Sequence, residues 1–243
     1  MKCDLCPRKC LVDRKKGEKG ICGQTENLKV ARAALHFWEE PCISGDAGSG
    51  AVFFSGCPLH CVFCQNENIA NGTVGKEISL ERLVDIFLEL QEKRANNINL
   101  VTPGHFVPQI VKALDQARKE GLTLPVVYNT SSYETVDTIK MLEGYVDIYL
   151  PDFKYMSPVL SKKYSHAPDY AEVAKAAIAE MVRQTGKAVF VNGDEDNLIL
   201  SGTIVRHLTL PGCMADSMQI LKYLHDTYGD MILSLIHISE PTR

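Results

Sequence analysis

Three cysteines, Cys57, Cys61 and Cys64, stand in the spacing C-x3-C-x2-C directly after the apolar run 51–54. The apolar run is typical of a buried strand, so the sequence predicts a strand that leads straight into a loop carrying three thiolates. Soft thiolate ligands suit zinc or an iron–sulfur cluster. A structural zinc site is closed by four ligands, whereas a [4Fe-4S] cluster held by three cysteines leaves one iron open to a substrate or cofactor. The spacing therefore favours a reactive iron–sulfur centre.

Two other interpretations of this loop stay open. Zinc could use the same cysteines with His60 as a fourth ligand, although His60 directly precedes Cys61 and adjacent residues are awkward ligands for one tetrahedral ion. The three cysteines could also simply pack in the core.

The composition of the whole chain narrows the class of protein. Of its 243 residues, 45% are hydrophobic and 23% are charged, and the formal net charge is −4. These values are typical of a soluble globular protein with one large core and a small appendage. The acidic balance gives no reason to expect nucleic-acid binding, no apolar stretch is long enough to cross a bilayer, and the N-terminus lacks a signal-peptide pattern. We therefore expect a cytoplasmic protein without nucleic-acid or membrane partners.

The N-terminal residues 1–26 carry a second group of cysteines, Cys3, Cys6, Cys10 and Cys22. Their segment is too short and too polar for a core of its own, so a bound metal would have to supply the folding energy. A structural zinc, a second iron–sulfur cluster and a metal-free cysteine-rich loop all remain open. Cysteines in ligand-spaced groups, in a chain without a signal peptide, favour metal binding in a reducing compartment over disulfides.

Residues 27–49 are predicted to be a connector, and residues 50–232 show strands alternating with amphipathic helices. Such alternation predicts an α/β fold with βαβ units and a parallel sheet, here a partial (β/α)6 TIM-like barrel. We expect strands at 51–56, 97–102, 124–129, 146–150 and 203–210, helices at 80–94, 107–119, 134–142 and 169–185, and a hairpin insertion at 188–200.

Residues 233–243 are predicted not to belong to the natural protein. Leu-Ser-Leu-Ile-His-Ile-Ser-Glu-Pro-Thr-Arg looks like the in-frame translation of a sequencing-library adapter and should be left out of fold reasoning. We therefore expect a longer natural chain, whose barrel is C-terminally truncated here. Resequencing the locus from source DNA tests this expectation.

Four segments of the chain resemble the radical S-adenosylmethionine (SAM) enzymes, and in particular relatives of the pyruvate formate-lyase activating enzymes, including a branch with an N-terminal cysteine module. They are Cys3–Cys10, Cys57–Asn66, Leu150–Tyr155 and Arg206–Gly212. The resemblance implies a [4Fe-4S] cluster on Cys57, Cys61 and Cys64, with SAM bound at the open iron. In that family, reductive cleavage of SAM gives a 5′-deoxyadenosyl radical that abstracts hydrogen from a target.

The resemblance also implies roles for polar residues at the ends of strands, where βα barrels carry their functional groups. Asp152 and Lys154 lie two residues apart, so their side chains share one face of an extended strand end, and they match a SAM-contacting Asp-x-Lys pair. A surface salt bridge is the plainer interpretation. Arg206 matches a strand arginine near the adenosyl group, where a simple ion pair is again the alternative.

Five further residues complete the expected cofactor site. Thr102, with Pro103, stands where the family often has Gly-Gly-Glu, and this sequence departs from that motif. Asn129 and Ser131 could hydrogen-bond the ribose, or could serve only as turn residues. Phe63 and Asn66 belong to the cluster loop itself.

The leading hypothesis is a radical SAM enzyme, an oxidoreductase, that acts on an unidentified target. A glycyl-radical enzyme is one candidate target, since activating enzymes take hydrogen from a backbone glycine. Expected partners are SAM, an electron donor such as flavodoxin or ferredoxin, and a protein substrate. The alternative is a non-catalytic iron–sulfur sensor or electron-transfer protein, which would need neither an open iron nor a polar set at the strand ends.

Overall fold

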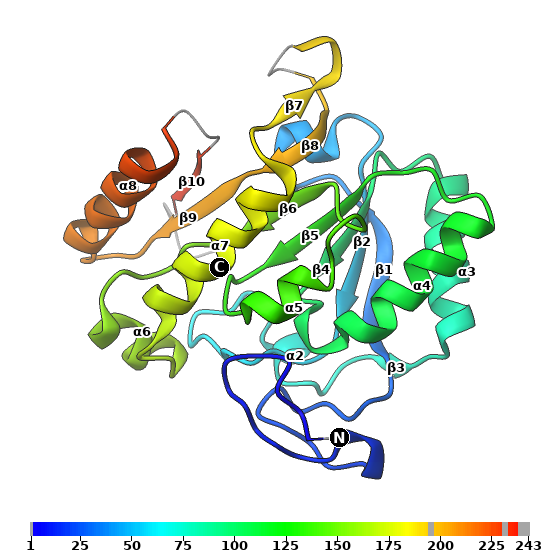
Figure 1. Ribbon diagram of the computed structural model, residues 1–243, viewed down its shortest axis with the longest axis horizontal. Helices are drawn as coiled ribbons and strands as arrows, with labels where there is room; N and C mark the ends of the chain where they lie inside the picture. The colour runs from blue at the N-terminus through cyan, green and yellow to red at the C-terminus, as the bar shows by residue number, and fades with distance from the viewer. Residues whose placement is uncertain (1, 194–196, 230–232, 238–243) are drawn as a thin grey trace.

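The computed structural model describes residues 2–193, 197–229 and 233–237. Its main sheet has eight strands in the order β3-β1-β2-β4-β5-β6-β8-β7 (Figure 1). A second pairing joins β9 to β10. The strands are β1 (Lys29–His36), β2 (Ser49–Phe54), β3 (Lys76–Glu77), β4 (Ile98–Val101), β5 (Val126–Thr130), β6 (Ile148–Pro151), β7 (Val189–Phe190), β8 (Ile199–Thr203), β9 (Val205–Thr209) and β10 (Leu233–His237).

The centre of the sheet is parallel. β2, β4, β5, β6 and β8 pair in parallel, whereas β1, β3 and β7 pair antiparallel to their neighbours. Only Ile204 separates β8 from β9, and a parallel bridge between Asp152 and Arg206 carries the pairing of β6 on to β9. The parallel series therefore continues through β9 to β10, and among the described strands β2 and β10 do not pair, as expected for a partial barrel.

Helices connect these strands. They are α1 (Pro41–Ser44), α2 (Glu67–Ala70), α3 (Leu80–Glu92), α4 (Val107–Lys119), α5 (Val136–Lys140), α6 (Pro158–Ser165), α7 (Tyr170–Thr185) and α8 (Met214–Tyr228), with short 3-10 turns at Arg14–Lys16, Gly104–Phe106 and Val191–Gly193. Ser79 caps the N-terminus of α3, because its hydroxyl accepts a hydrogen bond from the Arg82 backbone amide. Within the described residues, no helix is both long and apolar enough to cross a membrane.

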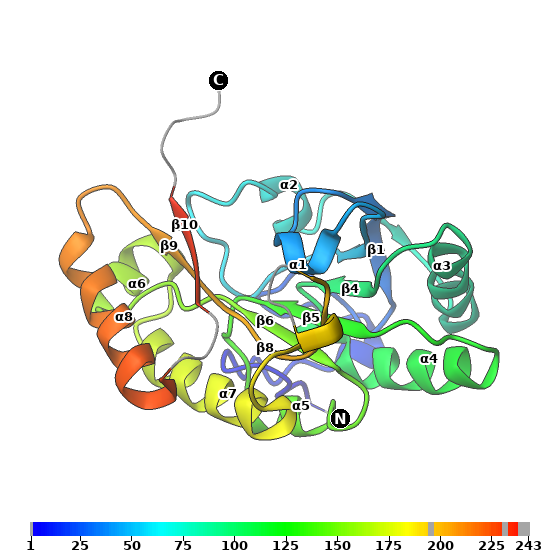
Figure 2. The ribbon, with the colours of Figure 1, turned by 90° about the horizontal axis from the view of Figure 1, so that it is seen from above.

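Two faces of the sheet are buried in different ways. The largest apolar cluster lies between the sheet and the helices α3, α4, α5 and α7, and it includes the fully buried Phe87 and Leu114. On the other face, α1 inserts Ile43 against Val127 and Leu150. Figure 2 shows α1 on the side of the sheet opposite α4, α5 and α7. The short α1 thus covers the concave side of the open barrel with apolar side chains. Polar residues lie instead at the carboxyl ends of the strands.

Most expected elements are present, with some corrections. The helix expected at 134–142 is confined to Val136–Lys140, and the strand expected at 203–210 begins earlier, as β8, and breaks at Ile204. The helices α6 and α8 were not expected. Antiparallel pairing of β7 with β8 confirms the hairpin at 188–200, although Asp194–Asp196 at its turn lie outside the described residues.

The adapter-like tail remains a prediction. Leu233–His237 form β10, in parallel register with β9, and residues 238–243 lie outside the described part of the chain. Pairing in the fold does not address the genetic origin of this segment, which only the coding DNA can establish.

Candidate functional site

The three-cysteine loop begins at the carboxyl end of β2, where the chain turns sharply. Gly56 has a φ of 90°, and a Cβ at this position would collide with the carbonyl of Cys22. Only glycine adopts this conformation and allows that approach without strain. The loop is therefore in direct backbone contact with the N-terminal cysteine segment.

The thiols of this loop are close neighbours. Burial is the main cause that raises the pKa of Cys57 to about 12; the nearby Cys61 and Cys64 contribute to the rise, and the backbone amides of Leu59 and His60 oppose it. Burial likewise raises the pKa of Cys64, and a hydrogen bond from the backbone amide of Asn66 opposes this rise. Within the described residues, however, no three His, Cys, Asp or Glu side chains are already arranged to hold a metal ion.

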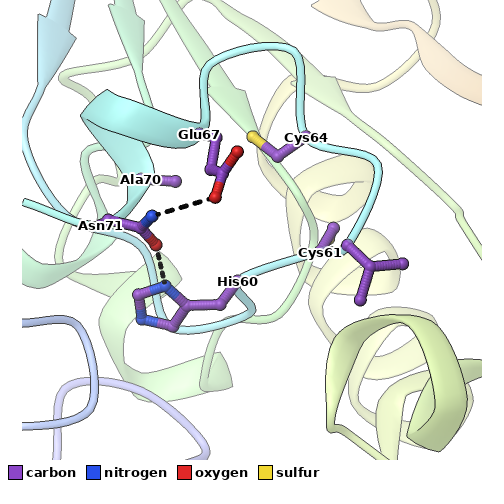
Figure 3. A pocket seen from close by; sticks show the side chains of 7 residues that line it. His60, Cys61, Cys64, Glu67, Ala70 and Asn71 are labelled. Atoms are coloured by element: carbon purple, nitrogen blue, oxygen red, sulfur yellow. Dashed lines mark hydrogen bonds between the residues drawn. The ribbon is translucent and has the colours of Figure 1, made fainter.

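The chemistry of this donor set fits an iron–sulfur cluster. Amide donors directed at the sulfurs stabilise anionic ligands, and high thiol pKa values mean that binding must release protons. A hollow of about 320 Å³ adjoins Cys61 and Cys64 on the side of α2 and gives space beside both residues (Figure 3).

His60 is held in a different role from a metal ligand. Its Nε2 lies 2.8 Å from the carbonyl oxygen of Ile21, and its Nδ1 lies 3.2 Å from Asn71 Oδ1. Figure 3 shows this ring turned toward Asn71 and Glu67 at the wall of the hollow. Because a carbonyl only accepts, Nε2 carries a proton and has no lone pair for zinc. This geometry disfavours the zinc interpretation that uses His60.

A buried hydroxyl chain ends on the central cysteine. The hydroxyl of Ser165 lies 2.9 Å from Cys61 Sγ and donates to it, and the Tyr155 hydroxyl lies 2.7 Å from Ser165 Oγ. Phe63, expected to contact the cofactor, packs edge-on against Tyr155 and Tyr164, and its cofactor contact stays a prediction. The loop is thus fixed from the α6 side by both polar and aromatic contacts.

Four of the expected cofactor residues meet in one hydrogen-bonded set. Lys154 Nζ lies 2.6 Å from Asp152 Oδ2, and Arg206 Nε lies 2.9 Å from Asp152 Oδ1. Arg206 Nη2 also donates to Asn129 Oδ1 at 2.7 Å. The side chains come from β5, β9 and the segment that follows β6, so neighbouring parallel strands bring them to one edge of the sheet.

Electrostatics keep this set ionised despite its burial. Burial by itself would raise the pKa of Asp152, but Arg206 and Lys154 outweigh it and the pKa falls below its usual value. For Lys154, burial lowers the pKa, yet the Asp152 carboxylate, together with the neighbouring Cys61, raises it above normal. Lys154 in turn partly opposes the rise in the pKa of Cys64. The charged set lies beside the cysteine loop, because Tyr155, the residue after Lys154, is joined through Ser165 to Cys61.

Sequence reasoning missed two members of this set. Glu39, whose side chain is 11% exposed, pairs with Arg206 at 2.8 Å and accepts from Asn99 and Asn129. Asn99 is a polar residue in the middle of the buried strand β4, and that is the signal that could have found it. Glu39 gave no such signal, because it lies in a connector whose path cannot be read from its residues.

The remaining expected residues lie around this set without joining it through a side-chain hydrogen bond that the structure records. Thr102 adopts a φ of 55°, and its amide donates to the carbonyl of Asn129. The Ser131 carbonyl accepts from Tyr170. Asn66 is exposed at the start of α2 and lines a second hollow, of about 460 Å³, which Cys64 also lines.

The N-terminal cysteine segment is docked at the same edge of the sheet (Figure 1). All nine cysteines are free thiols. Burial is the main cause that raises the pKa of Cys6 to about 12, with smaller contributions from Glu134, Cys22 and Cys10, and Cys3 and Cys10 add to the raised pKa of Cys22. Arg8 binds the carbonyl oxygens of Pro58, Ser165 and His166, all in or beside the three-cysteine loop.

Comparisons with known proteins bear on the fold and the family of this chain. Two solved structures share the fold: HydG, a maturase of the [FeFe]-hydrogenase (TM-score 0.52, 15% identity, 75% of this chain and 41% of HydG), and the methylornithine synthase PylB (TM-score 0.50, 14% identity, 74% and 50%). The uncharacterized protein MJ0674 of Methanocaldococcus jannaschii is 28% identical over 215 residues, 86% of this chain. The chain spans 57% of that relative's length.

A family model adds the decisive match. Residues 51–197, more than half of the chain, match the model of the radical SAM superfamily. Members of that superfamily use a [4Fe-4S] cluster and SAM. The chain belongs to the radical SAM superfamily.

Proposed function

We propose that this protein binds a [4Fe-4S] cluster through Cys57, Cys61 and Cys64 and cleaves SAM reductively beside it. The observation that carries the proposal is the link between the three-cysteine loop and the set of Asp152, Lys154 and Arg206: Tyr155, the residue after Lys154, hydrogen-bonds Ser165, which donates to Cys61. When bound and reduced, such a cluster supplies an electron that converts SAM to methionine and a 5′-deoxyadenosyl radical, which takes hydrogen from a target.

The residues of the chain have separate tasks in this proposal. The cysteines anchor the cluster and leave one iron for the methionine end of SAM. Asp152 and Lys154 bind polar groups of SAM, and Arg206 with Asn129 orients its adenosyl part. Ser131 and Thr102 lie at neighbouring strand ends, within the zone where ribose contacts are expected. The side chains of Asp152, Lys154 and Arg206 are 22%, 15% and 12% exposed, so little water would reach a reactive radical beside them.

We further propose that the target is a protein, with a glycyl-radical enzyme as the first candidate. The support is the likeness of four segments to activating enzymes, which act on a backbone glycine. Flavodoxin or ferredoxin is the proposed electron donor.

The two ends of the chain carry separate proposals. The N-terminal segment 1–26 is proposed to hold a second metal through Cys3, Cys6, Cys10 and Cys22. Residues 233–243 are proposed to be foreign to the natural chain.

A non-catalytic sensor is the weaker candidate. Such a protein would need no buried, charge-balanced set next to its cluster, and burying Asp152 and Arg206 costs energy that a sensor has no reason to spend. An open ligand position together with this set favours catalysis.

The test is an anaerobic assay for 5′-deoxyadenosine after reconstitution with iron and sulfide, using dithionite as reductant. We expect product from the wild type and only background from Cys57→Ala, Cys61→Ala and Cys64→Ala. Cys42→Ala is the matched control, because Cys42 lies with the apolar cluster on the concave face, and it should retain activity. Turnover by Cys61→Ala, or none by a wild type with an intact cluster, would contradict the proposal.

A further inference from the structure

The strand-end set is the hydrogen-bonded group of Asp152, Lys154, Arg206 and Asn129. Glu39 contacts this set from a segment outside the barrel strands. It lies in the short link between β1 and α1, and its carboxylate extends to residues of three different strands. Its Oε1 lies 2.8 Å from Arg206 Nη1, and its Oε2 accepts from Asn129 Nδ2 at 2.9 Å and from Asn99 Nδ2 at 3.1 Å. One carboxylate therefore holds β4, β5 and β9 side chains together.

Those contacts leave Arg206 a single orientation. Its guanidinium donates to Glu39, to Asp152 and to Asn129, in each case at 2.7–2.9 Å. A planar guanidinium bound on three sides cannot rotate without breaking buried, charge-assisted hydrogen bonds. The side chains of Arg206 and Glu39 are only 12% and 11% exposed, so water does not readily replace a lost partner.

Glu39 also decides which way the two amides face. Both asparagines donate their NH2 group to Oε2, so each must turn its carbonyl oxygen away from Glu39. For Asn129 this oxygen accepts from Arg206. For Asn99 the oxygen is buried and has no hydrogen-bond partner within the described residues. Glu39 thereby fixes the direction of both asparagine amides and of the Arg206 guanidinium.

The charges balance around this carboxylate. Asp152 alone would face two cations, Arg206 and Lys154, and Glu39 adds a second negative charge in direct contact with Arg206. Burial lowers the pKa of Arg206, but Asp152, Glu39 and the nearby Glu40 overcome this and raise it. Without Glu39, the arginine would be left with an unpaired side in a buried site.

We infer that Glu39 is a positioning residue, which holds Arg206 and Asn129 in the orientation that receives the adenosyl part of SAM. It acts through those two side chains and not by touching the reacting atoms. This inference rests on the proposed function, and it adds a residue that the family motifs in this sequence do not include.

The test is a double-mutant cycle on SAM binding, measured by isothermal titration of the reconstituted protein without reductant. The variants are Glu39→Gln, Arg206→Gln and their combination. We expect Glu39→Gln to weaken SAM binding about 10- to 100-fold, as is usual for a residue that orients a ligand-binding group. In the Arg206→Gln background the same change should add little, because the residue through which Glu39 acts is gone.

Controls separate positioning from a loss of folding. Asp46→Asn removes a carboxylate from an exposed position of the same connector and should leave SAM affinity unchanged. Iron content should be the same in all variants. In turnover assays Glu39→Gln should raise KM for SAM more than it lowers kcat. If Glu39→Gln does not fold, Glu39→Asp, which keeps the charge but withdraws it by one methylene, enters the same cycle with the same expectation.

Two results would overturn the inference. Unchanged SAM affinity in Glu39→Gln would show that the carboxylate positions nothing. Losses that add fully in the double variant would show that Glu39 does not act through Arg206. Failure of the wild type to bind SAM at all is a different result, because it refutes the proposed function itself.

Discussion

Thr102 has a backbone conformation that β-branched residues rarely adopt. Its φ of 55° lies in the left-handed region, at the end of β4 and beside the strand-end set. Such strain costs about 1–3 kcal/mol and collects at functional sites, where the surrounding fold maintains it. Replacing Thr102 therefore tests directly whether this conformation lowers the stability of the fold.

We predict that Thr102→Gly raises the free energy of unfolding by about 1 kcal/mol, since glycine relieves the strain but loses more chain entropy on folding. Urea unfolding of the metal-free protein measures the change. Thr102→Ala is the matched control, because alanine keeps the Cβ that causes the strain, and it should bring no gain. Equal stability of both variants would contradict the strain argument.

Ser165 is a second residue whose role can be measured directly. It is fully buried, and its hydroxyl donates to Cys61 Sγ. Hydrogen bonds to cluster sulfurs stabilise the more negative, reduced state and so raise the reduction potential. We predict that Ser165→Ala lowers the reduction potential of the reconstituted cluster, measured by EPR-monitored titration. Ser161→Ala, a buried serine whose hydroxyl binds only the Pro158 carbonyl, should leave it unchanged. Identical potentials in wild type and Ser165→Ala would refute this role.

At the scale of elements, two arginines of the N-terminal segment contribute to its attachment to the barrel. Arg8 donates to three backbone carbonyls and also lies over the Tyr133 ring, with 5.1 Å from its Cζ to the ring centroid. Arg14 is buried and donates to the carbonyl of His105. These contacts link the four-cysteine segment to the loops that follow β2 and β4.

We predict that Arg8→Ala lowers the free energy of unfolding by about 2 kcal/mol, because it leaves part-buried carbonyls without their charged donor. Limited proteolysis should then cut within residues 2–26 faster than in the wild type. Lys9→Ala is the control, since Lys9 is exposed on the same segment, and it should behave as wild type. Unchanged proteolysis of Arg8→Ala would mean that other contacts hold the segment.

A buried acid makes the stability of the whole molecule depend on pH. Any side chain at Gly104 would collide with the Glu134 carboxyl, which packs under this loop. Burial raises the pKa of Glu134 from 4.5 to about 7, and hydrogen bonds from Thr130 and Tyr128 only partly oppose the rise. The folded state therefore favours the protonated acid. This contribution is complete below the unfolded pKa and is lost as the pH rises through the folded pKa.

Glu134→Gln removes that dependence, because the amide stays neutral and still accepts hydrogen bonds from both hydroxyls. We predict equal stability of variant and wild type at pH 4.5, and a variant that is more stable by about 3 kcal/mol at pH 8. Urea unfolding across this pH range measures the difference. A difference that does not change with pH would contradict the raised pKa.

The amino-acid sequence predicts the strands and most helices of the molecule better than it predicts which polar side chains meet in the site. Buried parallel strands and amphipathic helices have strong local patterns, so β2, β4, β5 and β6 could be predicted. The helices α6 and α8 have weaker apolar patterns. The Asp152, Lys154 and Arg206 set could be assembled because parallel strands share an edge. Glu39 could not, since only the folded path of the connector brings it to Arg206.

The most direct test of the central claim is the EPR spectrum of the reduced, reconstituted protein before and after addition of SAM. A cluster held by Cys57, Cys61 and Cys64 leaves one iron for SAM, so we predict that SAM changes the spectrum of the wild type. A second cluster closed by four N-terminal cysteines would contribute a signal that SAM does not alter. A spectrum that saturating SAM leaves wholly unchanged would mean that no iron is open, and would contradict the account of this protein as a SAM-cleaving enzyme.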